Sequence, residues 1–166
     1  MRPIVIFPDP RLRIPAEPVE DFGPDLRLLA DGLAEAMRSV SARGITAPHI
    51  GVARRLVALR LTSEEPLRFY VNPRIDWVSE ETERHTEGSI SMPGVTEEIE
   101  RPARVRVVYR DLDGAEQVEE AQGFRAACHQ HEIDQLDGIF WIDRLSPLRR
   151  DRLVKRYQKL RRRGTV

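Results

Sequence analysis

The chain has 166 residues, of which 40% are hydrophobic and 33% are charged, and its 27 lysine and arginine residues balance 27 aspartate and glutamate residues. This composition excludes disordered and membrane-embedded classes, no apolar run reaches the roughly 18–20 residues that span a bilayer, and the single cysteine excludes an internal disulfide. We therefore expect one soluble, cytoplasmic domain over residues 1–166, without a signal peptide.

The first half of the chain predicts one helix followed by short strands. Apolar residues recur at three- and four-residue steps from Leu26 to Val40, which indicates an amphipathic helix over about residues 24–41. Short β-type runs follow, at residues 55–61, 67–71 and 74–79. Asn72 and Pro73, between the second and third runs, predict a turn.

The second half predicts a hairpin and two helices. Residues 104–110 alternate as in a half-buried strand, and residues 111–114 (DLDG) predict a turn into a returning strand at 116–121. Helices are expected at residues 124–136 and about 146–163. The order of helix, strands, helix and helix favours an α+β fold with an antiparallel sheet over a parallel doubly wound one.

The predicted helix at 124–136 carries the most informative polar cluster. His131 and Gln135 are four residues apart, so they share a helix face, with Glu132 beside them. An H-E-x-x-H motif uses this spacing to bind a metal through two histidines while the glutamate activates bound water. Here glutamine replaces the second histidine, so on these residues alone a mixed polar surface helix is the alternative.

Three segments resemble, in order and spacing, the motifs of the peptide deformylases. They are residues 44–51 (GITAPHIG, with Ala42 at the first glycine position of the motif), 87–91 (EGSIS) and 130–138 (QHEIDQLDG). The family patterns are G-x-G-L-A-A-x-Q, E-G-C-L-S and Q-H-E-x-D-H-L-x-G. The resemblance extends over about residues 4–160. It implies antiparallel sheets around a central helix that carries the third motif, with an N-terminal and a C-terminal helix.

The resemblance also implies an activity. Peptide deformylases are metal-dependent hydrolases that remove the formyl group from the N-terminal methionine of new bacterial proteins, usually with ferrous iron, and nickel, cobalt or zinc can substitute. A cysteine and two histidines bind the metal, a glutamate is the general base, and a glutamine and a backbone N–H hold the formyl oxygen. By resemblance, the metal-ligand positions are Ser89, His131 and Gln135. The base, glutamine and oxyanion-amide positions fall on Glu132, His49 and Ile90.

Two of these three ligand positions are changed. A serine hydroxyl and a glutamine amide are weak neutral ligands compared with a thiolate and an imidazole. We therefore expect no tightly bound metal, and efficient deformylation weakened or lost.

Three alternatives to this expectation stay open. A zinc, iron or nickel site could be rescued by His49 with His131 and Glu132 or Glu87, although His49 otherwise only fills the space of the glutamine. Cys128 either lends a thiolate or is a core thiol. Ser89 could act as a nucleophile with a histidine base. His129 should point about 200° away from His131 on the helix.

Four further positions match the substrate cleft of the family, namely Gly44, Glu87, Gly88 and Arg101. Glu87 and Arg101 are expected either to pair with each other or to touch the peptide backbone. An ordinary surface arginine is the alternative for Arg101.

The charges are unevenly distributed. Between Arg144 and Val166 lie 10 basic residues and one acidic residue, which leaves 17 basic and 26 acidic residues in the preceding part of the chain. Clustered arginine attracts phosphate, so the last helix is expected to contact RNA or the ribosome, as the C-terminal helix of bacterial deformylases does; a solvated helix face is the alternative. Two functional hypotheses result: a hydrolase of formyl-methionyl or other N-acylated peptides, or a catalytically silent homologue that binds peptide N-termini or a partner.

Overall fold

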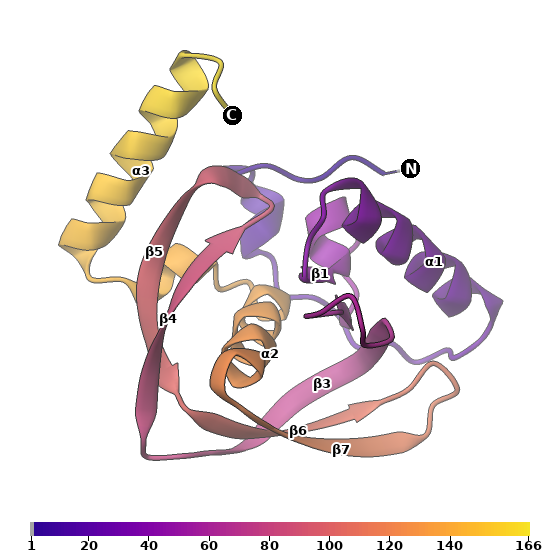
Figure 1. The fold of residues 1–166 in the computed structure, drawn as a ribbon. Helices are drawn as coiled ribbons and strands as arrows, with labels where there is room; N and C mark the ends of the chain where they lie inside the picture. The colour runs from indigo at the N-terminus through magenta and orange to yellow at the C-terminus, as the bar shows by residue number, and fades with distance from the viewer. Residues whose placement is uncertain (1) are drawn as a thin grey trace.

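The computed structural model describes residues 2–166 (Figure 1). Its α-helices are α1 (Pro24–Ser39), α2 (Gly123–Leu136) and α3 (Pro147–Arg162), and its short 3-10 helices are η1 (Pro10–Arg13), η2 (Ala47–Ile50) and η3 (Trp141–Arg144). Its strands are β1 (Gly44–Thr46), β2 (Leu56–Leu59), β3 (Arg68–Val78), β4 (Thr82–Ser89), β5 (Met92–Pro102), β6 (Arg104–Arg110) and β7 (Glu116–Gln122). Among the described residues, no helix is both long and apolar enough to cross a membrane.

The strands form two antiparallel sheets around α2. One sheet has five strands in the order β1-β2-β3-β6-β7, and the other is the β4–β5 hairpin. Figure 1 shows α2 at the centre, with the hairpin on one side and β3, β6 and β7 below it. The predicted α+β class, with antiparallel sheets around a central helix, is confirmed.

Helix α1 packs its apolar stripe against the short strands. Leu26, Leu33 and Met37 are buried in one cluster with Ile45 and Leu56. The predicted helix is therefore correct, although it ends two residues before the expected residue 41. This packing anchors β1 and η2, which form one wall of the site.

The predicted turn at Asn72-Pro73 is wrong, because β3 continues through it. Asn72 adopts a positive φ of 50°, and the pairing with β6 shifts register between Val71 and Arg74. The Asn72 side chain also bonds the backbone of Val19 in both directions, at 2.8 and 2.9 Å. The two residues therefore form a bulge within one strand, and the Asn72 backbone N–H donates to the Arg55 carbonyl at 2.9 Å rather than to β6.

Helix α3 lies on the outer side of β5 (Figure 1). Leu153 and Tyr157 are buried against the core, as the helical spacing predicts. Leu148, in the first turn, is 61% exposed and lies outside this buried face.

Candidate functional site

A cavity of about 800 Å³ opens between β1, the β4–β5 hairpin and α2. Eight of the ten predicted site residues line it: Gly44, His49, Glu87, Gly88, Ser89, Ile90, His131 and Glu132. Arg101 and Gln135 lie outside this lining. Apolar side chains, among them Ile6, Val95 and Phe124, complete the walls. The topology thus brings the three motifs together around one space.

Helix α2 is buried on several sides, and most of its polar side chains have structural partners. Gln130 Nε2 donates to the carbonyl of Pro102 at 3.0 Å, and Gln135 Nε2 donates to the carbonyl of Leu12 at 2.8 Å. Buried polar groups without such partners carry a free-energy cost, so these bonds allow a polar helix to occupy the core.

His131 is held by a buried ionic chain behind it. Its Nδ1 lies 2.8 Å from Glu87 Oε1, and Arg101 donates to both oxygens of Glu87 at 2.6 and 3.0 Å. Arg101 also bonds Asp134 at 2.9 Å, and Arg144 bonds Asp134 in turn. Because Nδ1 faces Glu87, the other ring nitrogen of His131 is left for the cavity. Arg101 is 5% exposed, so the alternative of an ordinary surface arginine is wrong.

These contacts set the charges of the pair. Burial raises the pKa of Glu87, but the hydrogen bonds from His131 and Arg101 outweigh burial and hold that pKa below its usual value. Burial lowers the pKa of His131, yet the hydrogen bond to Glu87 and the charges of Glu132 and Glu87 raise it overall. The structure therefore favours an ionised Glu87 beside a readily protonated His131.

Glu132 sits in the cavity wall with an unsatisfied oxygen. Burial, the largest cause, raises the pKa of Glu132 to about 7, with Glu87 adding to the effect. Its Oε2 is buried and has no hydrogen-bond partner among the described residues. Its Oε1 lies so close to Gly44 that a Cβ at residue 44 would approach it to 2.8 Å. A side chain at residue 44 would therefore have to displace the Glu132 carboxyl and the Leu59 side chain.

His49 is 1% exposed and also lines the cavity. Its Nδ1 lies 2.9 Å from both the backbone nitrogen and the hydroxyl oxygen of Thr46. Burial, followed by the charge of His131, lowers the pKa of His49 to about 3. Its Nε2 is buried without a partner in the described part of the chain.

The ligand positions do not fit the metal of the deformylase pattern. Ser89 Oγ accepts a hydrogen bond from the Ser91 backbone at 3.1 Å, and a neutral hydroxyl is a poor substitute for a thiolate. The Gln135 amide is directed to Leu12. Within residues 2–166, no three or more His, Cys, Asp and Glu side chains are grouped to hold a metal ion. The absence of a tightly bound metal nonetheless stays a prediction for metal analysis.

Two neighbouring residues of α2 have different surroundings. Cys128 lines the cavity, where burial and the charge of Glu132 raise the pKa of its thiol to about 12, which opposes the thiolate alternative. His129 faces away, as helical geometry predicts, and pairs with Glu119. Tyr70 also donates to Glu119, at 2.9 Å, so this group attaches α2 to β3 and β7.

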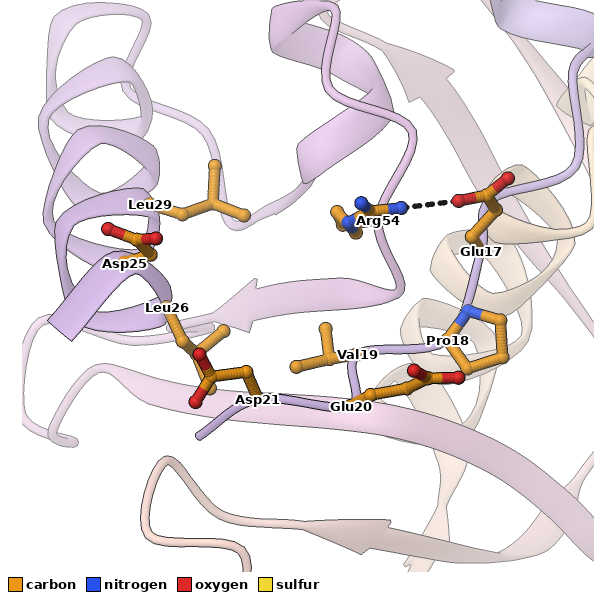
Figure 2. Close-up of a pocket in the computed structure, with 9 residues that line it drawn as sticks. All are labelled: Glu17, Pro18, Val19, Glu20, Asp21, Asp25, Leu26, Leu29 and Arg54. Atoms are coloured by element: carbon orange, nitrogen blue, oxygen red, sulfur yellow. Dashed lines mark hydrogen bonds and ion pairs between the residues drawn. The ribbon is translucent and has the colours of Figure 1, made fainter. Parts of the chain in front are cut away.

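A second hollow, of about 530 Å³, lies on another part of the surface (Figure 2). Leu26 and Leu29 of α1 face Val19 across it, and Arg54 pairs with Glu17 at its rim. None of the predicted site residues lines this hollow.

Thr46, Asp134 and Arg144 contribute to the site but were not identified from the sequence. Asp134 and Arg144 fall inside segments that carry the resemblance, yet the resemblance did not indicate their pairing. The only sequence signal for Thr46 was its place in the first motif, where the pattern has alanine. Their roles depend on contacts between elements, which no local pattern contains.

Comparison with known proteins identifies relatives along the whole chain. The family model described as "Polypeptide deformylase" matches residues 1–151. A Brucella melitensis protein named "Peptide deformylase-like" is 59% identical over 162 residues, covering 98% of this chain and 99% of that protein. Rhizobium meliloti has a "Peptide deformylase-like" protein at 53% identity (98% and 94% covered) and a "Peptide deformylase" at 43% (96% and 93% covered).

Solved structures agree with these relatives. The crystal structure of peptide deformylase from Ehrlichia chaffeensis has a TM-score of 0.92 at 32% identity, covering 100% of this chain and 99% of that one. A peptide deformylase from Legionella pneumophila has a TM-score of 0.92 at 33% identity, covering 99% and 97%.

Proposed function

The chain belongs to the polypeptide deformylase family, and we propose that it binds the N-terminal end of formyl-methionyl peptides while its deformylation is weakened or lost. The observation that carries this proposal is the pair of changed ligand positions: Ser89 lines an otherwise formed cavity with His131 and Glu132, and the Gln135 amide is bonded to Leu12 outside that lining. Loss of outer partners alone costs about 10–100-fold in metal affinity, so the change of two inner ligands should cost more. Without a metal, Glu132 has no activated water to deprotonate.

The remaining residues retain the means to bind a peptide end. In this proposal the Ile90 backbone N–H and His49 face the acyl oxygen, and Gly44, Glu87 and Gly88 shape the cleft. Arg101 acts indirectly, because its charge is bound to Glu87 and Asp134. We propose that residues 1–166 form one such domain and that it works in the cytoplasm, where the substrates of the family are made.

Metal analysis of the purified protein, paired with a formyl-Met-Ala-Ser hydrolysis assay and calorimetric binding of the same peptide, tests the proposal. We expect peptide binding with substoichiometric metal and little turnover. The double change Ser89→Cys with Gln135→His should then raise both metal content and turnover. Stoichiometric metal with robust turnover in the natural sequence would overturn the proposal, and absence of peptide binding would overturn its other half.

Hydrolysis of an N-acylated peptide through Ser89 is a second candidate function. The observation that favours it is the hydrogen bond from His131 Nδ1 to Glu87, since a carboxylate that orients a histidine base is a recurring part of nucleophilic sites. Metal-independent turnover that disappears in Ser89→Ala would support this candidate. Equal turnover in Ser89→Ala would exclude it.

We also propose that α3 contacts RNA on the ribosome. Arg149 and Arg156 bond β5 backbone carbonyls at 2.8 and 3.2 Å, which attaches the helix to the domain. The exposed Arg152, Lys155 and Lys159 lie on the same helix. The triple change of these three to glutamine should weaken co-sedimentation with ribosomes in low salt, whereas Arg38, Arg74 and Arg84 changed together to glutamine should not. No co-sedimentation of the natural protein would refute the contact.

A further inference from the structure

Helix α3 carries a stripe of exposed side chains that begins with an apolar residue and continues with cations. The steps of four, three and four residues place them on one side of the helix: Leu148, Arg152, Lys155 and Lys159. This α3 stripe points away from the domain, because Leu153 and Tyr157 occupy the opposite side of the helix and are buried. Within residues 2–166, the three cations of the stripe make no ion pair, so their charge is available to a partner.

The hollow beside α1 has the complementary character (Figure 2). Its floor is apolar, since Leu26 and Leu29 face Val19 across it. Four carboxylates line its rim, and Arg54 pairs with that of Glu17. In the described part of the chain the other three have no ion pair: Glu20, Asp21 and Asp25. This α1 hollow therefore suits a segment that has an apolar side chain followed by cations, and its charge repels phosphate.

The α3 stripe and the α1 hollow cannot meet within one copy of the protein. Figure 1 shows α3 outside β5 on one side of the molecule and α1 on the other side, with α2 between them. Two copies can bring the surfaces together. The formal net charge of the chain is zero at pH 7, so no net repulsion keeps the copies apart.

We infer that the protein self-associates head to tail, with the α3 stripe of one copy bound in the α1 hollow of a second copy. Leu148 covers the apolar floor, and the cations of the stripe pair with the rim carboxylates. The hollow holds only about 530 Å³ and its charges are exposed, so the contact is weak, reversible and sensitive to salt. Because it joins two different surfaces, further copies add to the dimer unless a ring closes.

This contact uses the cations that we propose for the ribosome. A copy whose α3 stripe is bound to a second copy cannot present the same stripe to RNA. Self-association and ribosome binding therefore exclude each other. The α1 hollow takes no part in RNA binding, which allows the two contacts to be tested separately.

The first test is sedimentation velocity of the full-length protein at pH 7 over a series of concentrations. In about 50 mM NaCl the sedimentation coefficient should rise with concentration, and about 500 mM NaCl should weaken the association about tenfold. A monomer at every concentration in low salt would overturn the inference.

The second test reverses the charge of each surface. Glu20→Lys with Asp25→Lys changes the hollow, and Arg152→Glu with Lys155→Glu changes the stripe. Each double variant alone should associate about tenfold more weakly than the natural protein. An equimolar mixture of the two should associate again, because the reversed stripe fits the reversed hollow.

A matched control separates the hollow from net charge. Glu64→Lys with Glu80→Lys makes the same change in net charge at exposed residues outside the hollow, and should stay within about threefold of the natural protein. Circular dichroism verifies that each variant is folded. Association that both reversals leave unchanged, or that the mixture of folded variants fails to restore, would overturn the pairing of stripe and hollow.

Ribosome binding responds differently to the same variants. The reversed hollow leaves α3 intact, so this variant should still co-sediment with ribosomes, whereas the reversed stripe should not. Loss of ribosome binding in the natural protein with retained self-association would refute the RNA contact alone. Ribosome binding without self-association would refute the head-to-tail contact alone.

Discussion

Gln135 donates its side-chain amide to the backbone carbonyl of Leu12, across 123 residues of sequence, at 2.8 Å. Gln135 occupies a metal-ligand position of the deformylase motif, but here its side chain forms a hydrogen bond that connects α2 to the segment before α1. This contact explains how a glutamine that is only 3% exposed is tolerated in the core.

Removing the hydrogen bond between Gln135 and the Leu12 carbonyl should destabilise the fold. Gln135→Leu leaves the Leu12 carbonyl without its donor, so we expect the free energy of unfolding to fall by about 1–3 kcal/mol in urea titration. Gln158→Leu, on the exposed side of α3, should change it by less than about 0.5 kcal/mol. Equal stability of the two variants would mean that the Leu12 contact contributes nothing.

A side chain at residue 44 should disturb the packing against Glu132 and Leu59. A Cβ at residue 44 would lie 2.8 Å from both Glu132 Oε1 and Leu59 Cδ2, so Gly44→Ala should lower the free energy of unfolding by about 1–3 kcal/mol. It should also weaken formyl-peptide binding, because the Glu132 carboxyl must move. Thermal or urea unfolding measures the first effect and calorimetry the second.

Gly32 offers the matched control for this change. An added Cβ there meets no heavy atom within 4 Å, and the residue lies in α1, so Gly32→Ala should stabilise the protein by about 0.5–1 kcal/mol. If Gly44→Ala behaved like Gly32→Ala, the close approach to Glu132 would be refuted.

The sequence predicted the elements whose signals are local. The stripe from Leu26 to Val40 and the DLDG turn at residues 111–114 each specify their own structure, so α1 and the β6–β7 hairpin were expected correctly. The β4–β5 hairpin was not expected. Its first strand buries Glu87 and exposes most other side chains, so it lacks the alternating apolar pattern of a half-buried strand.

For the candidate site, too, the sequence predicted what depends on local motifs and missed what depends on contacts between elements. The three motifs indicated which residues gather around the cavity, since motif order and spacing are readable in the sequence. The hydrogen-bond and ion-pair partners of these residues, which determine their chemistry, could not be predicted from the sequence. Arg101 reaches Asp134, and Gln135 reaches Leu12, only because the sheets fold around α2.

The ionic chain behind His131 should be costly to break. Arg101→Met removes the buried cation that pairs with Glu87 and Asp134, so we expect a loss of about 3–5 kcal/mol in the free energy of unfolding. Arg106→Met, which breaks the exposed pair with Asp76, should cost much less, because solvent screens that pair. Chemical denaturation at one pH measures the free energy of unfolding of both variants. Similar losses would argue against a structural role for the buried ion pairs of Arg101.

The pH dependence of stability should report the burial of Glu132. Burial raises the pKa of Glu132 from its usual value of 4.5 to about 7 in the folded protein. The folded state therefore holds this proton more tightly, and the contribution of Glu132 to stability is fully present below pH 4.5 and is lost as the pH rises to about 7. Glu132→Gln does not titrate, so relative to the natural protein its free energy of unfolding should rise by up to about 3 kcal/mol between pH 4.5 and 8.

Urea titrations of both proteins across this range measure the difference. Burial also lowers the pKa of His49 to about 3, which reduces stability as the pH falls below 6.5, and this effect is common to both proteins. The charge of Glu132 raises the pKa of His131, so the measured difference belongs to the coupled pair Glu132 and His131. Glu35→Gln, on the exposed side of α1, is the control and should follow the natural protein. Parallel curves for Glu132→Gln and the natural protein would contradict the prediction, because a raised pKa of Glu132 in the folded protein must separate them.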